Sequence, residues 1–295
     1  MLKSHGRYSY SPIVERPVYD WPGGARLAVY IAINIEVFPF GEGYGAELAP
    51  RQPEPDIVNF TWRDYGNRVG IWSLIEALDE HKLPATALLN TEIYEHCPQI
   101  PAAFRARRDE LVAHGRTNGE RQSDLNEADE RALIEGCRAV IARHEGTEPD
   151  GWLGPWLSES TVTPDLLDEA GYKYLLDWGS DDQPFWLKTR RGRILGIPYA
   201  RPTNDTPMLH RANVMPSTYA SILIDQFDEM LEQSRSRPLV FNLSLHPFMV
   251  GHAFRLRHLR RVFAHLAQHR ETVWLTHAGE IARYALGLPA GMIPQ

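Results

Sequence analysis

The sequence predicts an α/β fold, a distorted (β/α) barrel of seven or eight strands. Short apolar segments, typical of strands buried on both faces, alternate with amphipathic helical segments about seven times along the chain. Strands that alternate with helices in this way are parallel and are joined by right-handed crossovers. The chain has 295 residues, 43% of them hydrophobic, with no break in composition. We therefore expect residues 25–290 to form one domain and residues 1–24 to form an N-terminal arm that lies on the surface or on a neighbouring subunit.

The first expected strand is the apolar run "RLAVYIAINIE" at 26–36, and a polar segment rich in turn-forming residues follows it at 37–62. We expect this insertion to be a loop without secondary structure that folds over the site, since loops of this length are usually functional. The other expected strands lie at 85–90, 110–115, 150–156, 172–178, 185–189, 193–200, 238–247 and 272–276. The expected helices lie at 64–82, 99–108, 126–146, 163–171, 217–234, 256–270 and 278–287.

Polar side chains gather at the carboxyl ends of the expected strands, which is where (β/α) barrels carry their catalytic groups. The ionisable candidates are Glu36, His114, Asp177 and His246. Polar, cationic and aromatic candidates at the same ends are Asn34, Asn90, Arg116, Asn118, Trp156, Ser158 and Trp178. Any one of them could serve local structure alone. Two histidines and a carboxylate that each close an apolar strand favour a shared site.

Composition excludes several functional classes. The net charge of −7 and the scarcity of basic runs argue against nucleic acid and anionic membranes as partners. Cys97 and Cys137 are the two cysteines, and neither has a second cysteine at a metal-ligand spacing. The first residues lack the apolar core of a secretion signal, and no apolar stretch approaches the ~20 residues that span a bilayer. The sequence therefore predicts a cytoplasmic protein.

The order of these segments resembles the polysaccharide-deacetylase family (carbohydrate esterase family 4), and more closely its metal-independent allantoinase and cyclic-imide hydrolase branch. The resemblance covers roughly residues 25–285. It rests on five short segments: "NIEV" at 34–37, His114 with Asn118, "LGPW" at 153–156, Asp177 with Trp178, and "LSLHP" at 243–247. The resemblance implies a distorted (β/α) barrel. It also implies an oligomeric protein, and together with the aromatic arm at 7–21 this leads us to expect a homo-oligomer, a dimer or a tetramer.

The departures from the family pattern concern its metal site. The family's base aspartate corresponds to Glu36, its metal-binding aspartate to Val37, and its second metal-binding histidine to Asn118. The family's supporting arginine corresponds to Leu153. Because an alkyl group cannot coordinate and an amide is a weak ligand for zinc, the sequence predicts no metal ion and no other cofactor.

The expected function is metal-independent opening of a cyclic imide or ureide of the succinimide, dihydropyrimidine, hydantoin or allantoin type. Without a Lewis acid, a hydrolase is restricted to activated substrates, and we expect these to be small, planar and neutral. Glu36 is the expected general base, with a pKa raised by its apolar surroundings. His114 and Asn118 would hold the water or the oxyanion, and His246 would protonate the leaving nitrogen. Asp177 would orient a histidine, and His246 is the one we expect.

The remaining candidates would bind the substrate, with Trp156 and Trp178 forming a slot for a flat ring. Arg68 and Arg116 could bind a carboxylate or simply pair with local acids. Two other functions stay open from the sequence. One is a metal-dependent deacetylase of N-acetylated sugars, which requires three ligands. The other is a non-catalytic barrel that binds a carbohydrate or metabolite, for which a retained base and acid would have no use.

Overall fold

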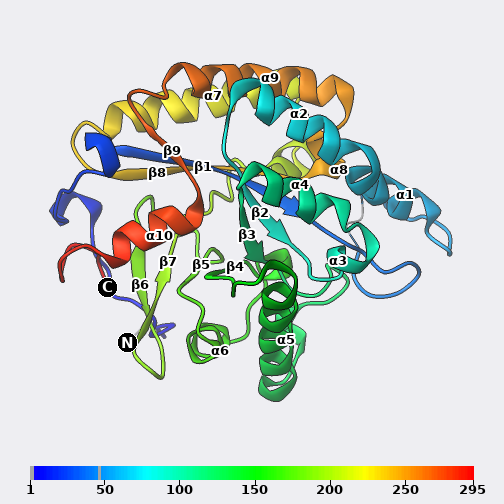
Figure 1. The fold of residues 1–295 in the computed structure, drawn as a ribbon, viewed down its shortest axis with the longest axis horizontal. Helices are drawn as coiled ribbons and strands as arrows, with labels where there is room; N and C mark the ends of the chain where they lie inside the picture. Colours follow the sequence, from blue (N-terminus) through cyan, green and yellow to red (C-terminus); the bar gives the residue numbers. More distant parts are fainter. Residues whose placement is uncertain (1–2, 46–47) are drawn as a thin grey trace.

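The computed structural model describes residues 3–45 and 48–295, so the expected arm and insertion each lie partly outside the described residues. A curled sheet of 9 strands lies at the centre, in the order β6-β7-β5-β4-β3-β2-β1-β8, with β9 paired to β1 (Figure 1). Its strands are β1 (Leu27–Ile35), β2 (Thr86–Leu89), β3 (Glu110–Ala113), β4 (Gly151–Trp152), β5 (Tyr174–Leu175), β6 (Phe185–Lys188), β7 (Arg193–Gly196), β8 (Leu239–Leu245) and β9 (Trp274–Thr276).

The predicted fold class is confirmed, and the sheet is a curled half-barrel. All pairings are parallel except that of β6 with β7, which form the predicted hairpin. β6 and β8 stand at the two ends of the strand order, and no ladder joins them within the described residues. The sheet is therefore open at that seam.

Register explains why polar side chains distant in sequence meet. Ile33 of β1 pairs with Leu245 of β8, Ile35 pairs with Leu89, and Leu89 pairs with Ala113. The residues that follow these strands therefore leave the sheet at nearly the same level. All nine residues of β1 are buried, and β1 pairs with β2, β8 and β9, so the first of these strand ends lies deep in the protein.

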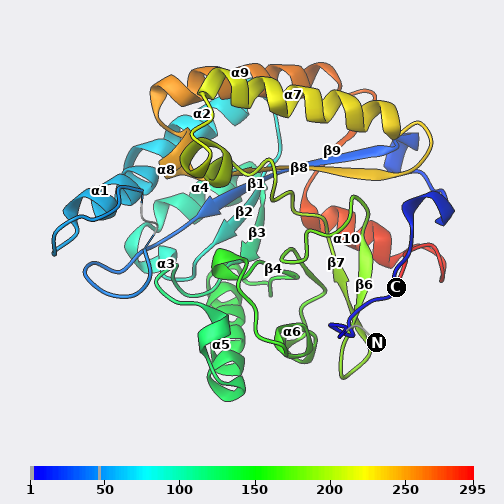
Figure 2. The same ribbon diagram turned by 180° about the vertical axis from the view of Figure 1, so that it is seen from behind.

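The helices cover the outside of the sheet. α7 (Pro216–Gln233), α9 (Ala253–Gln268) and α2 (Ile71–His81) lie on one side, as both views show (Figure 2). The remaining helices are α1 (Ile57–Tyr65), α3 (Ile93–His96), α4 (Gln99–Arg107), α5 (Glu127–Glu145), α6 (Thr163–Ala170), α8 (Pro247–Val250) and α10 (Ala278–Leu286). No helix in the described ranges is long and apolar enough to cross a membrane.

The prediction of an element-free insertion at 37–62 is wrong at its end, where α1 forms. The Asp56 side chain accepts a hydrogen bond from the Asn59 backbone N–H and caps this helix. A π-helical turn at Gly66–Gly70 then leads into α2. A Cβ at Gly70 would lie 2.3 Å from the Pro247 carbonyl oxygen, so glycine permits this turn to pack directly against the residue that follows His246.

The N-terminal arm lies along its own chain. Trp21 is fully buried, and its indole N–H donates to the Leu239 carbonyl oxygen at 3.1 Å. Arg7 forms an ion pair with Asp165 at 2.7 Å. The expected homo-oligomer stays a prediction, since these contacts concern one chain alone.

Candidate active site

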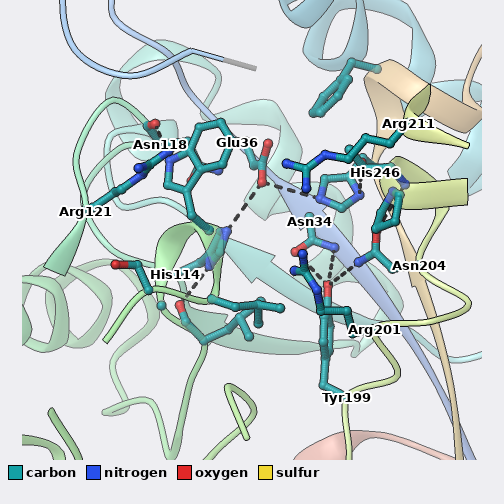
Figure 3. A pocket seen from close by; sticks show the side chains of 18 of the residues that line it. Asn34, Glu36, His114, Asn118, Arg121, Tyr199, Arg201, Asn204, Arg211 and His246 are labelled. Atoms are coloured by element: carbon teal, nitrogen blue, oxygen red, sulfur yellow. Dashed lines mark hydrogen bonds and ion pairs between the residues drawn. The ribbon is translucent and has the colours of Figure 1, made fainter. Parts of the chain in front are cut away.

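A pocket of about 290 Å³ lies at the carboxyl ends of β1, β3 and β8, and the three main ionisable candidates line it (Figure 3). Glu36 directly follows β1, His114 follows β3 and His246 follows β8. The Nε2 atom of His114 lies 3.6 Å from Glu36 Oε1, and that of His246 lies 3.5 Å from the same oxygen. All three side chains are almost fully buried. One carboxylate oxygen thus stands between two imidazole rings.

An aspartate that the sequence prediction missed holds His246. Asp205 Oδ1 lies 2.6 Å from His246 Nδ1, and Asp205 Oδ2 accepts the His246 backbone N–H at 2.7 Å. Asp205 is fully buried. Burial opposes charge on His246, but the attraction of Asp205 and Glu36 outweighs it and raises the pKa of His246 to about 10. The ring is therefore an imidazolium at neutral pH.

We predicted that the pKa of Glu36 is raised, and this prediction is wrong. Burial raises it, as we expected, but the attraction of His246 and the close approach of both imidazoles outweigh burial and lower the pKa to about 2. The apolar run before Glu36 indicated burial correctly. It gave no sign of the cation that the fold brings beside the carboxylate. Glu36 is consequently ionised across the neutral range.

His114 is oriented by the backbone. Its Nδ1 lies 2.8 Å from the Leu153 carbonyl oxygen, which can only accept. In a neutral ring the proton is therefore on Nδ1, and the lone pair on Nε2 faces Glu36. The buried Nε2 atom makes no hydrogen bond to any described residue. Two acceptors that face each other at 3.6 Å suit a ligand or water that donates a hydrogen to each.

The prediction that Asp177 orients His246 is wrong. Asp177 Oδ1 instead accepts the backbone N–H of Gly154 at 2.8 Å, next to the carbonyl that orients His114. Burial raises the pKa of Asp177 to about 7. Burial, and then the proximity of Asp177, raises the pKa of Glu159 well above its ordinary value. Asp177 therefore supports the backbone behind His114 and makes no contact with the imidazole of His246.

Asn90 connects the strand ends and does not line the pocket. It is fully buried, its Oδ1 accepts the Val37 N–H at 2.8 Å, and its Nδ2 donates to Asn118 Oδ1 at 3.0 Å and to the His114 carbonyl oxygen. Asn118 lines the pocket, and with its Oδ1 engaged it has an amide N–H group to offer. The predicted substrate-binding role of Asn90 is therefore replaced by a positioning role.

The pocket wall includes three further predicted residues, Asn34, Trp156 and Ser158. Trp156 adopts a left-handed backbone conformation with φ of 66°, and its indole N–H donates to the Asn118 carbonyl oxygen at 3.0 Å. This hydrogen bond fixes the indole beside the site, although bulky residues rarely adopt that conformation.

Three other predicted residues lie outside the pocket. The Trp178 indole donates to Glu159 at 2.7 Å. Arg116 pairs with Glu120 at 2.7 Å, and Arg68 approaches Asp64 at 3.8 Å. The predicted role of Trp178 as a second slot wall is therefore wrong, and so is substrate binding by Arg116. Arg68 and Arg116 pair with local acids, which was the other alternative that the sequence left open.

Comparison with known proteins places this site in a family. No family model matches the sequence. A Schizosaccharomyces pombe protein provisionally named polysaccharide deacetylase is 22% identical over 295 residues, covering 89% of this chain and 91% of that protein. A Pseudomonas aeruginosa PAO1 structure described as a probable polysaccharide deacetylase superposes with a TM-score of 0.81 at 25% identity over 93% of this chain and 97% of that one. The chain is similar in sequence and in fold to the polysaccharide-deacetylase family. The structure of Puue allantoinase also has this fold, with a TM-score of 0.80, 24% identity and 96% of both chains covered.

The three-ligand metal site that the family implies does not fit the residues of this pocket. Val37 does not line the pocket, and Asn118 offers an amide. His246 would have to give up the charge that Asp205 stabilises before it could coordinate. In the described part of the chain, three mutually close ligand atoms occur at Asp228, His265 and His269, on the outer helices α7 and α9. The groups that can act on a substrate in this pocket are therefore its own side chains.

Sequence reasoning missed the segment after β7. Tyr199, Arg201, Asn204, Thr206 and Arg211 line the pocket, and Asp205 lies beneath them. The signal was present, because "YARPTND" follows a predicted strand just as Glu36 and His114 do. Because this strand was expected to belong to a small hairpin, the residues at its carboxyl end were not included among the site candidates.

Proposed function

We propose that the protein is a hydrolase of carbon–nitrogen bonds other than peptide bonds, and that it opens cyclic imides or ureides to half-amides. The observation that supports this proposal is an ionised Glu36 between two imidazoles, one of which Asp205 keeps charged. The site thus places a proton donor, the charged His246, directly beside a base, the Glu36 carboxylate. Such a pair is what ring opening by water requires when no Lewis acid takes part.

Glu36 is the general base for an attacking water. A water that donates one hydrogen to Glu36 and the other to His114 Nε2 would be held with its lone pairs toward the pocket. As the water attacks the ring carbonyl, its proton passes to Glu36. The Asn118 amide can stabilise the oxyanion that forms.

His246 supplies the proton for the leaving nitrogen. When the carbon–nitrogen bond of the tetrahedral intermediate breaks, the imidazolium Nε2–H transfers its proton to the ring nitrogen, and the product is a carboxylic acid with an amide or urea at the other end. Glu36 then holds the proton from water and His246 lacks one. Because these groups lie 3.5 Å apart, the proton can return to His246 and restore the site.

The chemistry of the leaving group favours a cyclic imide or ureide. Its nitrogen is acylated on both sides, so the departing nitrogen shares negative charge with the second carbonyl. An acetamide of a sugar lacks this help and needs stronger electrophilic assistance, which zinc supplies in a metal-dependent deacetylase. Two of the relatives found by sequence are named as deacetylases, so metal-dependent deacetylation is the rival function.

Glu36→Gln tests the base. The variant keeps the shape and removes the proton acceptor, and we expect kcat for succinimide, dihydrouracil, hydantoin or allantoin to fall by roughly 10²–10⁴-fold. Glu135→Gln is the matched control, since Glu135 is an exposed residue of α5. His246→Ala should lower kcat as well. Turnover by Glu36→Gln equal to that of wild type would refute the assignment.

Chelation separates the proposal from its rival. We expect dialysis against a strong chelator to leave ring opening unchanged. A His265→Ala variant should accompany the assay, because the outer cluster at Asp228, His265 and His269 could retain an ion unrelated to catalysis. Loss of activity that zinc restores in both the wild type and His265→Ala would establish the metal-dependent reaction instead.

A further inference from the structure

Three arginines line the active-site pocket, and they come from two separate parts of the chain. Arg121 lies beyond β3, Arg201 follows β7, and Arg211 ends the turn that begins at Thr206. Figure 3 shows all three around the group formed by Glu36 and His246. The fold thus brings three permanent positive charges to one small cavity.

These arginines differ from most others in the chain because the described residues offer them no carboxylate within ion-pair distance. Arg7, Arg16 and Arg138 each pair with an acid at 2.7 Å. Arg121 makes only cation–π contacts, 4.0 Å above Tyr44 and 5.2 Å from Trp156, and its buried Nε has no hydrogen-bond partner among the described residues. The side chains of Arg201 and Arg211 form no ion pair or hydrogen bond with the described residues, and both residues are exposed.

Among the described residues, the charge balance of the pocket leaves these cations unneutralised. Glu36 is the one carboxylate among the residues that line the pocket, and His246 carries the charge opposite to it. Asp205 lies behind His246, bonded to its ring. The chain as a whole has a net charge of −7, so the concentration of positive charge is a local property of this cavity. Opposite charge on a ligand would be drawn to it.

We propose that the substrate is an anion, a small cyclic imide or ureide that carries a carboxylate, and that Arg201 and Arg211 bind the carboxylate while Arg121 adds positive charge to the same cavity. This inference rests on the proposed function and narrows its substrate class. It replaces the neutral substrate expected from the sequence. A guanidinium presents paired N–H donors that match a carboxylate, so it would orient the ring with its reacting carbonyl toward Glu36.

The reaction itself is balanced without an added reagent. Water gives its proton to Glu36, its oxygen bonds to the ring carbonyl, the ring carbon–nitrogen bond breaks, and the nitrogen takes the proton of His246. The carboxylate that binds the arginines is unchanged. Glu36 returns its proton to His246, and the new carboxylic acid releases the second proton of the water to solvent. The product is therefore a dianion, with its new carboxylate formed beside Glu36.

Matched substrate pairs test the inference. Dihydrouracil with its 6-carboxylate, and hydantoin with its 5-acetate, differ by one anionic group. We expect kcat/KM to be at least tenfold higher for the anionic member of at least one pair. This preference should weaken as the salt concentration rises. Arg201→Gln and Arg211→Gln should each remove most of the preference. Arg235→Gln, which breaks an exposed pair with Glu232 on the outer helix α7, should leave it intact.

A binding measurement separates this inference from the proposed function. Calorimetric titration of wild type with succinate and with succinamide compares a dianion and its neutral analogue without requiring turnover. Tighter binding of succinate that Arg211→Gln abolishes would support the anion site even if no ring were opened. Ring opening with equal kcat/KM for charged and neutral partners, and no difference in binding, would overturn the inference while leaving the hydrolase proposal in place.

Discussion

Asp205→Asn tests the electrostatic centre of the site, because this carboxylate is the neighbour that most strongly favours the charged form of His246. Its Oδ1 lies 2.6 Å from His246 Nδ1, and its Oδ2 accepts the backbone N–H of the same residue at 2.7 Å. The asparagine keeps the volume, and its carbonyl oxygen can still accept one of these hydrogen bonds. What the variant loses is the negative charge.

The size of the effect follows from the pKa of His246. Its rise from 6.5 to about 10 corresponds to roughly 5 kcal/mol in favour of the charged ring, at about 1.4 kcal/mol for each pKa unit. Asp205 and Glu36 share this contribution, and both also offset the cost of burial. Assigning half to Asp205 predicts that the pKa of His246 falls by about two units. The alkaline limit of activity should then move from near pH 10 to near pH 8.

The assay is the pH dependence of kcat/KM for the best cyclic substrate, measured from pH 5 to pH 10.5. We expect Asp205→Asn to lower the plateau and to shift the alkaline limb downward. Asp168→Asn serves as control, since Asp168 accepts one hydrogen bond from Thr189 on another part of the surface. An alkaline limb that stays in place, even with reduced turnover, would show that Asp205 acts on structure alone and would refute the charge argument.

Three further predictions concern stability. Burial raises the pKa of Asp177 to about 7 and that of Glu159 well above normal, so the stability that their protonation supplies is complete below their ordinary pKa values and is lost as pH rises toward the raised ones. Glu159→Gln should therefore flatten the loss of stability between about pH 5 and pH 7 in urea unfolding, and an unchanged slope would contradict this. Lys82 follows α2 with a left-handed φ of 51°, and Lys82→Gly should raise the unfolding free energy by about 0.5–1 kcal/mol in the same assay; a value equal to that of wild type would refute strain at this position. Asn90→Ala leaves the Val37 N–H without its acceptor and should lower the unfolding free energy by about 1–3 kcal/mol; a melting temperature equal to wild type would count against the positioning role.

The sequence was sufficient to predict the strands that carry the site. The apolar runs that end at Glu36, His114 and His246 are long or sharply bounded, and in a parallel sheet such ends converge on one edge. That these strand ends lie close together follows from the type of fold alone. The same rule applied to the end of β7 would have led to Arg201 and Asp205.

The partners of the site residues could not be predicted in the same way. Which carboxylate reaches His246 depends on the path of the loop after β7, and the sequence offered Asp177 as an equally plausible acid. Asn90 ends a strand as His114 does, yet its side chain turns into the protein and bonds Val37. Strand periodicity identifies a strand end, but the direction of a side chain in the first loop residue depends on tertiary contacts.

The order of charges in the pocket explains how a buried carboxylate can be a base at all. A buried carboxylate alone would take up a proton, because transfer from water is costly. Here Asp205, His246 and Glu36 alternate in sign along a line of short contacts, 2.6 Å and 3.5 Å long, so each charge is stabilised by its neighbour. The chain of three carries one net negative charge, which would repel an anionic substrate if it stood alone. The three arginines exceed that charge, and two of them, Arg201 and Arg211, are exposed. A neutral substrate would not need this excess of positive charge. The pocket therefore favours an anionic substrate, which the arginines attract and whose ring Glu36 and His246 open.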